Sequence, residues 1–419
     1  MRILICASDV PFHPTNNGFR RQLQGLVPEL GRRHEVRLIG YRHPDQSQVA
    51  GIDADMRVVP YVRPSSLQNA QDLALAVALR RPLRARRLVQ GLIGPLRHEL
   101  DRFRPDIVHV GPGKLAWLRR ELGARPKVLG VMDTWHLNVD ARAEGSTGLR
   151  AAAFRADAKR IRRFERTEYR GFDRVIVCNR GDLTELRERD PTLRFAVIPI
   201  GLDASAYAPD PDAVVDRKRI VFHGALDYAP NVRAVEYLAR RILPRVRALV
   251  PGAHLVIVGR DPAPAVLDLE ALPRVDVIGA VEDMRTWLTG SRVWVGPFLD
   301  GTGMKNKLLE AMATNLPAVV TPLGHQGLDD VTSGRELLIG STKEELAAHV
   351  VRVLEDDALA RNIGQAGGAY VRPRYDWSAV GHAYEILYEE ILSEKARQDV
   401  SAWTPGFSPT EFARGSQTR

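Results

Sequence analysis

The sequence predicts an α/β protein of two doubly wound domains, each a parallel sheet with helices on both faces. Three observations support this. The chain has 419 residues, which at about 100–200 residues per domain indicates two domains. Short runs rich in Val and Ile alternate with amphipathic patterns, and the alternation occurs twice. Between the two series, residues 201–218 are rich in Pro, Asp and Ala and lack hydrophobic periodicity.

The expected strands are short runs that are apolar at nearly every position, as strands buried on both faces require. In the first half they are residues 2–8, 35–41, 57–62, 107–110, 128–132 and 174–178. In the second half they are residues 219–223, 255–258, 275–278, 293–297 and 318–321. Amphipathic patterns predict helices at residues 233–250, 305–313 and 343–354.

These elements divide the chain into an N-terminal domain over residues 1–200, a linker over 201–218 and a C-terminal domain over 219–376. A last helix over residues 377–395 is expected to pack back on the N-terminal domain. Residues 396–419 are polar and contain helix-breaking Pro and Gly, so we expect a frayed tail.

The charge is strongly basic: 60 Lys and Arg against 51 Asp and Glu give +9, and only eight of the cations are Lys. Such a balance favours anionic partners. Nucleic acid is not expected, because no nucleic-acid-binding signature occurs. Two segments, 80–104 and 150–170, are Arg-rich. Either each meets an anionic membrane or acceptor, or each is a solvated helix face, and the sequence leaves both interpretations open.

Cysteine usage and the first residues indicate a reducing compartment. The two cysteines, Cys6 and Cys178, lie in apolar runs and are expected to be buried thiols. The first apolar run has five residues and is followed by Asp9, unlike a signal peptide. No run approaches the roughly 18 residues that span a membrane. We therefore expect a cytoplasmic location, with peripheral association at the inner face of the membrane left open.

Several catalytic signatures are absent from the sequence. It has no P-loop, no HExxH, no CxxC and no Gly-x-Ser-x-Gly elbow, and its eleven His show no metal-ligand spacing. We expect no metal and no tightly bound cofactor. The segment GPGKLA at residues 111–116 faintly resembles a dinucleotide fingerprint, but the acidic partner of that motif is missing.

Residues 298–313, FLDGTGMKNKLLEAMA, carry the clearest functional pattern. A predicted strand runs into a glycine loop that opens a helix, and helix N-termini favour anions. Lys305 and Lys307 add two cations there, although Lys is rare in this chain. Glu310 shares a helix face with Lys307. Cations followed one turn later by a carboxylate suit a nucleoside diphosphate, with the carboxylate on ribose hydroxyls; an ordinary surface Lys–Glu pair is the alternative.

This segment and others, in order along most of the chain, resemble the retaining glycosyltransferases of family 4. The resemblance rests on LLEAMA with LPAVVTP after it, and on FERTEYRGFDRVIVCNRGDLTEL, HLVIVGR, VDVIGAVEDM and RVWVGPF. GALDYAPNVRAVEYL with MKNKLLEAMA is similar to bacterial sugar transferases associated with exopolysaccharide assembly. The resemblance implies the GT-B fold, in which two Rossmann-like domains face each other across a cleft, the N-terminal one binding acceptor and the C-terminal one nucleotide sugar.

The resemblance, together with strand-end positions, gives a set of site residues. The expected donor-binding residues are Gly18, Gly224, Arg233, Val281, Gly301, Thr302, Gly303 and Glu310. The expected catalytic residues are Lys305, Lys307, Asp133 and His136. Asp133 and His136 follow a predicted strand, where ligands of open α/β sheets bind. A turn glycine at Gly18 and a structural His136 are the alternatives.

The sequence departs from the family pattern at two places. Most relatives have a Glu eight residues before Glu310, where this chain has Thr302, with Asp300 two residues earlier. Most also have an Arg and a Lys in the loop that here is residues 224–231; Arg233 is the nearest cation. We expect Lys305 and Lys307 to supply the charge missing from that loop.

The resemblance implies a metal-independent transferase that moves a sugar from a nucleotide-sugar donor to a hydroxyl acceptor with retention of configuration. The acceptor would be a saccharide, a lipid-linked saccharide or a small natural product. A sugar-nucleotide epimerase or hydrolase of the same fold is an alternative. So is an inactive donor-binding partner subunit, because the first Glu of the family pattern is missing. The sequence does not specify base, sugar, acceptor or oligomeric state.

Overall fold

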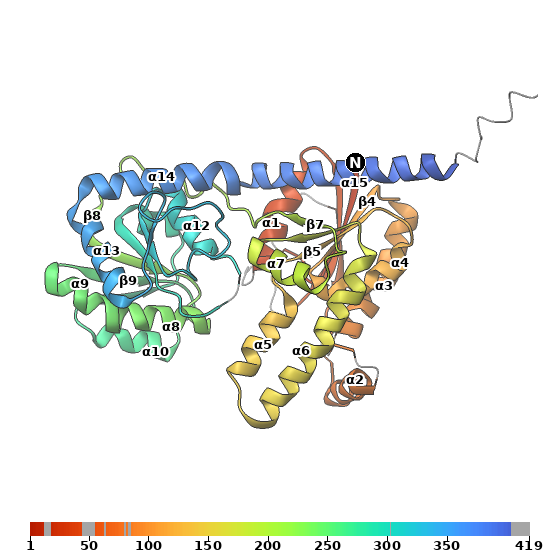
Figure 1. Ribbon diagram of the computed structural model, residues 1–419, viewed down its shortest axis with the longest axis horizontal. Helices are drawn as coiled ribbons and strands as arrows, with labels where there is room; N and C mark the ends of the chain where they lie inside the picture. The colour runs from red at the N-terminus through yellow and green to blue at the C-terminus, as the bar shows by residue number, and fades with distance from the viewer. Residues whose placement is uncertain are drawn as a thin grey trace, which may run out of the picture.

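The computed structural model describes residues 1–11, 18–43, 55–62, 64–78, 81–82, 85–301 and 303–403. It contains two parallel β-sheets, each flanked by helices, that lie side by side along the long axis of the molecule (Figure 1). The predicted α/β class with two Rossmann-like domains is confirmed.

The first sheet has seven strands in the order β3-β2-β1-β4-β5-β6-β7. These are β1 (Arg2–Ala7), β2 (Glu35–Arg42), β3 (Asp55–Pro60), β4 (Ile107–Gly111), β5 (Lys127–Val131), β6 (Arg174–Val177) and β7 (Phe195–Val197). The α-helices of this half are α1 (Gly18–Gly31), α2 (Ser66–Ala78), α3 (Ala85–Arg102), α4 (Arg119–Leu122), α5 (Trp135–Glu144), α6 (Gly148–Glu168) and α7 (Arg180–Arg189).

The second sheet has six strands in the order β10-β9-β8-β11-β12-β13. These are β8 (Asp216–His223), β9 (His254–Val258), β10 (Val275–Gly279), β11 (Ser291–Gly296), β12 (Ala318–Val320) and β13 (Leu338–Ile339). Its α-helices are α8 (Ala229–Tyr237), α9 (Leu243–Leu249), α10 (Pro264–Leu267), α11 (Met284–Thr289), α12 (Asn306–Ala313), α13 (Lys343–Glu355) and α14 (Asp357–Tyr375). The last helix, α15 (Trp377–Trp403), follows the elements of both domains in the sequence.

Each apolar run that predicted a strand forms one. In the central strands burial on both faces selects apolar residues, whereas the edge strands β3 and β10 are partly exposed. The strands β1 and β4 are buried almost throughout. The strands β7 and β13 were missed; they are only three and two residues long. Cys6 and Cys178 are buried free thiols, as predicted, and burial raises the pKa of Cys6 to about 12.

The helix α15 returns to the first domain and packs on α1 (Figure 1). Its Tyr384 and Tyr388 are buried among apolar residues of β1 and α1. Tyr388 Oη lies 2.7 Å from Nδ1 of the buried His109, and Gln22 Nε2 donates to Tyr384 Oη at 2.5 Å. This packing anchors the end of the chain to the domain where it began.

The chain therefore crosses between the sheets twice, and the two crossings are bonded to each other. Leu202 N donates to Tyr375 O at 2.7 Å, and Trp377 N donates to Leu202 O at 3.1 Å. The indole of Trp377 lies where Cβ atoms on Gly25 and Gly201 would stand, 1.8 and 2.4 Å from ring atoms. Only glycine leaves room for that ring. The predicted linker is shorter than expected, because β8 already begins at Asp216.

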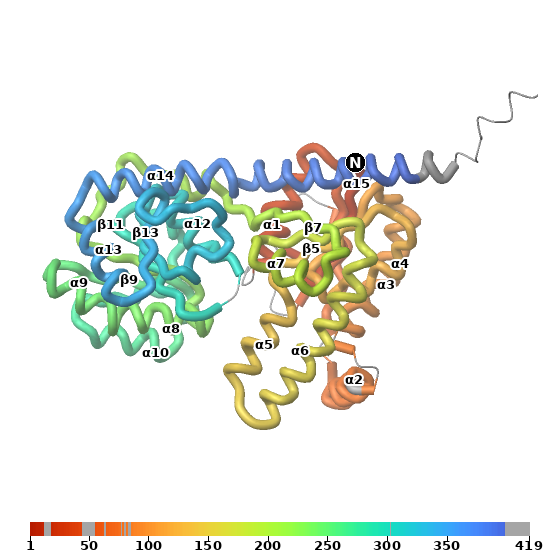
Figure 2. The backbone as a smooth tube through the Cα atoms, viewed as in Figure 1, coloured from red at the N-terminus to blue at the C-terminus, as the bar shows by residue number. Residues whose placement is uncertain are grey.

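The helices α5 and α6 pack on each other as an antiparallel hairpin that projects from the first domain (Figure 2). No helix in the described part of the chain combines the length and the apolar character that crossing a bilayer would require.

Candidate functional site

Two adjoining hollows lie between the domains, where the strands of both sheets end. The first hollow, of about 830 Å³, follows the carboxyl ends of β8, β9 and β10 and reaches the start of α12. Open α/β sheets bind ligands at this edge. It is lined by Gly18, Arg21, Tyr207, His223, Gly224, Ala225, Asp227, Tyr228, Ala229, Asn231, Gly259, Arg260, Ala280, Val281, Met284, Asn306, Lys307 and Glu310.

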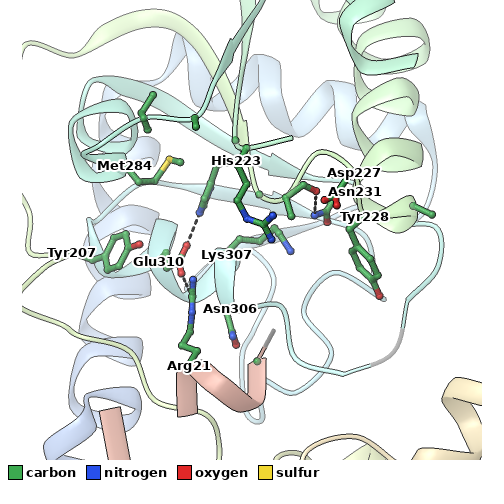
Figure 3. Close-up of a pocket in the computed structure, with 18 residues that line it drawn as sticks. Arg21, Tyr207, His223, Asp227, Tyr228, Asn231, Met284, Asn306, Lys307 and Glu310 are labelled. Carbon is green, nitrogen blue, oxygen red and sulfur yellow. Dashed lines mark hydrogen bonds and ion pairs between the residues drawn. The ribbon is translucent and has the colours of Figure 1, made fainter. Parts of the chain in front are cut away.

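A hydrogen-bonded chain crosses the floor of the first hollow (Figure 3). Glu310 Oε2 lies 2.8 Å from His223 Nε2, and Glu310 Oε1 pairs with the Arg21 guanidinium of the other domain. Behind His223, the Trp294 indole donates to its Nδ1 at 3.0 Å. The indole N–H can only donate a hydrogen bond, so His223 Nδ1 accepts it. His223 Nε2 therefore carries the ring hydrogen and donates a hydrogen bond to Glu310. The chain fixes the direction of the carboxylate.

The charge of Glu310 is stabilised although the residue is buried. Burial raises the pKa of the carboxyl, but Arg21 and the hydrogen bond from His223 outweigh it and hold the pKa at about 2. Each carboxylate oxygen keeps a free lone pair after accepting one hydrogen bond. Glu310 is thus an oriented, permanently charged acceptor at the floor of the hollow.

Lys307 extends along the same hollow. Its Cε lies 2.8 Å from where a Cβ on Gly224 would stand, and Gly224 has φ +153°, so a larger residue there would displace the lysine. Its Nζ stands 5.3 Å from the centroid of the Phe298 ring. Burial lowers the pKa of Lys307 to about 8, partly offset by Glu310. An anion in the hollow would stabilise the ammonium.

The ammonium of Lys305, unlike that of Lys307, is bound by backbone carbonyls of the glycine loop. Its Nζ donates to Gly301 O at 3.0 Å and to Gly303 O at 2.8 Å, so the ammonium holds the glycine loop. The residue is buried, and burial lowers its pKa to about 8. Lys305 also lines the second hollow, but these bonds make it mainly a scaffold for the loop.

The glycine loop lies against the first domain. Gly303 has φ +78°, and a Cβ there would stand 2.4 Å from Asp133 Oδ1. Glycine is therefore needed both for the backbone and for the approach of the carboxylate. Gly301, with φ +98°, packs near Pro230. Thr302 lies outside the described residues.

The second hollow, of about 630 Å³, continues from the first into the N-terminal domain. Gly18, Asn306 and Lys307 line both. The wall in the N-terminal domain includes Ser8, Asp9, Phe19, Pro112, Gly113, Lys114, Met132, Asp133, Trp135, Asn138, Val139, Arg142 and Cys178. Burial, with Asp182 nearby, raises the pKa of Asp133 to about 6. Asp133 lines this hollow, and its catalytic role stays a prediction.

Two predicted site residues lie elsewhere. The prediction that His136 faces the cleft is wrong: it is fully buried, its Nδ1 lies 2.6 Å from Glu165 Oε2, and its Nε2 lies 2.9 Å from Glu185 Oε1. The two ring nitrogens of His136 thereby connect α5 to α6 and to α7. Arg233 pairs with Asp300 at 2.5 Å and lines neither hollow. Its guanidinium therefore fixes the start of the glycine loop.

Sequence reasoning missed several residues of the first hollow. Arg260, at the end of HLVIVGR and two residues after β9, lines the hollow and pairs with Asp261. His223 ends β8 directly after the buried apolar residues 220–222, which was a usable signal. Arg21 gave no signal, because its partner Glu310 stands 289 positions away. Among the described residues, no group of three or more His, Cys, Asp or Glu could hold a metal ion.

Two family models match the chain in succession. A glycosyl transferase 4-like domain matches residues 17–201, and a model of glycosyl transferases group 1 matches residues 217–356. Phosphatidyl-myo-inositol mannosyltransferase of Mycobacterium tuberculosis is 29% identical over 223 residues, which are 49% of this chain and 56% of that protein. The chain thus spans about half the length of this curated relative.

Solved structures share the whole fold at low identity. Sucrose-phosphate synthase of Thermosynechococcus elongatus superposes with a TM-score of 0.70 at 17% identity, covering 94% of this chain and 100% of that one. HepE of Anabaena in complex with UDP and glucose gives 0.60 at 13% identity, covering 95% and 99%. With both halves matched by glycosyltransferase models and two parallel-sheet domains facing each other, the chain belongs to the GT-B glycosyltransferases of the family-4 type.

Proposed function

We propose that this protein transfers a sugar from a nucleotide-sugar donor to a hydroxyl acceptor, with retention of anomeric configuration and without a metal. The observation that carries the proposal is the first hollow, which Lys307, Arg260 and the start of α12 line together with the oriented carboxylate of Glu310. Cations beside a fixed carboxylate match a nucleoside diphosphate, with phosphates on the cations and ribose hydroxyls on Glu310.

Two unpaired amide oxygens support a sugar as the transferred group. Asn231 Oδ1 and Asn306 Oδ1 are buried and lack a hydrogen-bond partner among the described residues, and both residues line both hollows. A buried acceptor without a donor costs about 1–3 kcal/mol. Hydroxyl groups of a sugar at the junction of the hollows would supply the missing donors.

In the proposed mechanism, negative charge develops on the leaving diphosphate as the bond to the sugar breaks. Lys307 and Arg260 stabilise that charge from side chains held in place before the reaction. The acceptor hydroxyl attacks on the same face that the diphosphate leaves, and the leaving phosphate takes its proton. Asp133, which lines the second hollow, accepts a hydrogen bond from the acceptor and orients it.

The acceptor enters from the second hollow, on the side of the N-terminal domain. Related proteins support a donor of this kind: a relative from Corynebacterium glutamicum, 26% identical over 209 residues, is named as GDP-mannose-dependent. HepE is seen with UDP-glucose. The names of these relatives differ in base, and the residues of the first hollow do not specify one.

A panel of nucleotide sugars, with mass detection of products, tests the function. Transfer to added acceptors supports it. Formation of an isomeric nucleotide sugar would indicate an epimerase instead, and free sugar that is unaffected by any acceptor would indicate a hydrolase. Tight donor binding without turnover in any mixture would indicate an inactive donor-binding subunit. Thr302 keeps that last outcome relevant, since family relatives have Glu at its position.

We also propose that the protein acts in the cytoplasm, against the inner face of a membrane. The stripe formed by Arg155, Lys159, Arg163 and Arg166 recurs at helical spacing on α6. All four are exposed, and none has an ion pair among the described residues. Leu149, at the tip of the α5–α6 hairpin, is 91% exposed. Cations beside an exposed apolar tip suit an anionic bilayer.

Vesicle co-sedimentation tests this membrane contact. Replacing Arg155, Lys159 and Arg163 by Gln should weaken binding to phosphatidylglycerol vesicles roughly 100-fold, at about 1 kcal/mol per cation. The control variant replaces Lys218, Arg240 and Arg241, which are exposed on the second domain. Equal binding of both variants, or equal binding of the wild type to neutral vesicles, would contradict the contact.

A further inference from the structure

One cation of the second hollow has no role in the mechanism above. Lys114 lies in GPGKLA, directly after β4, and its side chain lines the second hollow. Among the described residues it makes no hydrogen bond and no ion pair within 4 Å. Gly113 lets its loop approach the buried Tyr169, since a Cβ there would stand 2.2 Å from Tyr169 Oη. The lysine is therefore held at the wall of the hollow by a packed loop.

The nearest carboxylate does not neutralise Lys114, because other groups already bind it. Asp9 Oδ1 accepts from Arg20 Nε at 3.1 Å and from Nη2 at 3.0 Å, and Oδ2 accepts from Ser8 Oγ at 2.7 Å. His43 Nε2 also lies 3.2 Å from Asp9 Oδ1. Asp9 and the buried Arg20 thus cancel each other, and Lys114 remains as a net positive charge.

The same hollow holds a second uncompensated cation. Arg142, on α5, lines it and makes no ion pair within the described residues. Asp133, the other carboxylate that lines this hollow besides Asp9, stands beside Lys305. Lys114 is half-buried and has no partner among the described residues, and burial lowers the pKa of its ammonium, with Asp9 opposing that effect. Withdrawing an unpaired charge from water is costly. An anion bound in the hollow would remove this cost.

We propose that Lys114 binds an anionic phosphate group of the acceptor, so that the acceptor is a phosphorylated saccharide or the head of a phospholipid. This inference rests on the proposed function, because it places the acceptor in the second hollow. Two cations, Lys114 and Arg142, match the charge of a phosphate better than that of a neutral hydroxyl. Lys114 anchors the phosphate, and the acceptor hydroxyl reaches the junction with the first hollow near Asp133.

Calorimetry with matched probes tests the proposal. The first hollow is filled with the nucleoside diphosphate that binds best among UDP, GDP, ADP and dTDP, so that phosphate probes meet only the second hollow. The probes are glucose 6-phosphate for a free phosphosugar, dihexanoylphosphatidylglycerol for a lipid head, and glucose as the neutral counterpart. The variants are Lys114→Gln and Lys343→Gln, the latter removing a charge in the second domain that pairs with Glu344.

The wild type and Lys343→Gln should bind at least one phosphate probe about tenfold or more tighter than Lys114→Gln does. Glucose should bind all three proteins equally. The probe that shows the difference identifies the source of the phosphate. Lys114→Arg should restore part of the binding, and it also serves if Lys114→Gln fails to fold. Equal loss for glucose and phosphate probes, or no binding of either phosphate probe to the wild type, would overturn the proposal.

The two proposals fail in different ways. A wild-type protein that binds no nucleoside diphosphate and no nucleotide sugar would contradict the proposed function. A wild-type protein that binds and turns over a donor, but whose phosphate binding is insensitive to Lys114, would contradict this inference alone.

Discussion

Arg21 and Glu310 form an ion pair that joins the two domains across the first hollow. Arg21 comes from α1, near the start of the chain, and Glu310 from α12 of the second domain. The buried carboxylate therefore acts as a contact between domains as well as a wall of the hollow. A ribose hydroxyl would join this network at a free lone pair, so donor binding and domain approach would be coupled.

Glu310→Gln should weaken donor binding and lower kcat/KM by similar factors, about tenfold or more. The amide keeps the shape but loses the charge that Arg21 and His223 stabilise. Calorimetry and steady-state kinetics measure the two quantities, with Glu389→Gln on the exposed side of α15 as the control. An unchanged donor affinity with loss of only the chemical step would contradict the ribose role.

Lys307→Ala should lower kcat/KM by about 10²-fold or more, the scale of one lost preorganised donor. Lys307→Arg should recover only part, because the narrow passage beside Gly224 suits a compact ammonium better than a planar guanidinium. Steady-state kinetics with Lys343→Ala as the control decide this. Near-normal activity of Lys307→Ala would contradict this role of the lysine and would leave Arg260 and the start of α12 to bind the diphosphate.

Donor affinity should fall as pH rises through about 8, the pKa to which burial lowers Lys307. Below that pH the ammonium of Lys307 is charged in both the free and the bound protein, so its titration does not change donor affinity. A bound diphosphate raises the pKa, so binding above pH 8 takes up a proton. Calorimetry in two buffers at pH 8.5 should detect this uptake, and Lys307→Arg should abolish it. A constant affinity from pH 7 to 9.5 in the wild type would contradict it.

Turnover should persist in EDTA, because side-chain cations and the start of α12 supply the positive charge that the leaving diphosphate needs. Product formation is measured after dialysis against EDTA, with and without added Mg²⁺ or Mn²⁺. Complete loss that either ion restores would contradict a metal-independent site.

The sequence predicted those features of the fold and the site that depend on a local pattern of residues. Doubly buried strands are visible as apolar runs, and Lys307 and Glu310 share a helix face because of their spacing alone. Residues that meet across the domains could not be found this way. Arg21 reaches Glu310 only once both domains are packed, because the two residues are 289 positions apart. A long separation in sequence likewise hides the approach of Asp133 to Gly303.

His136 shows that sequence reasoning can also fail over a short distance in the chain. Its place after β5 predicted a residue at the cleft, but one step into α5 turns the ring inward, between Glu165 and Glu185. Helix phase, which a single strand end does not reveal, decides which side chain faces the ligand. Arg233 differs from prediction for a related reason, since Asp300 on the neighbouring loop captures its guanidinium.

The central claim is that the protein transfers a sugar from a nucleotide donor with retention. The most direct measurement follows the anomeric proton of a turned-over donor by ¹H NMR, using the donor and acceptor found in the panel. The account predicts that the first-formed glycoside has the anomeric configuration of the sugar in the donor. A first-formed glycoside of inverted configuration, or no consumption of any nucleotide sugar with any acceptor, would contradict it.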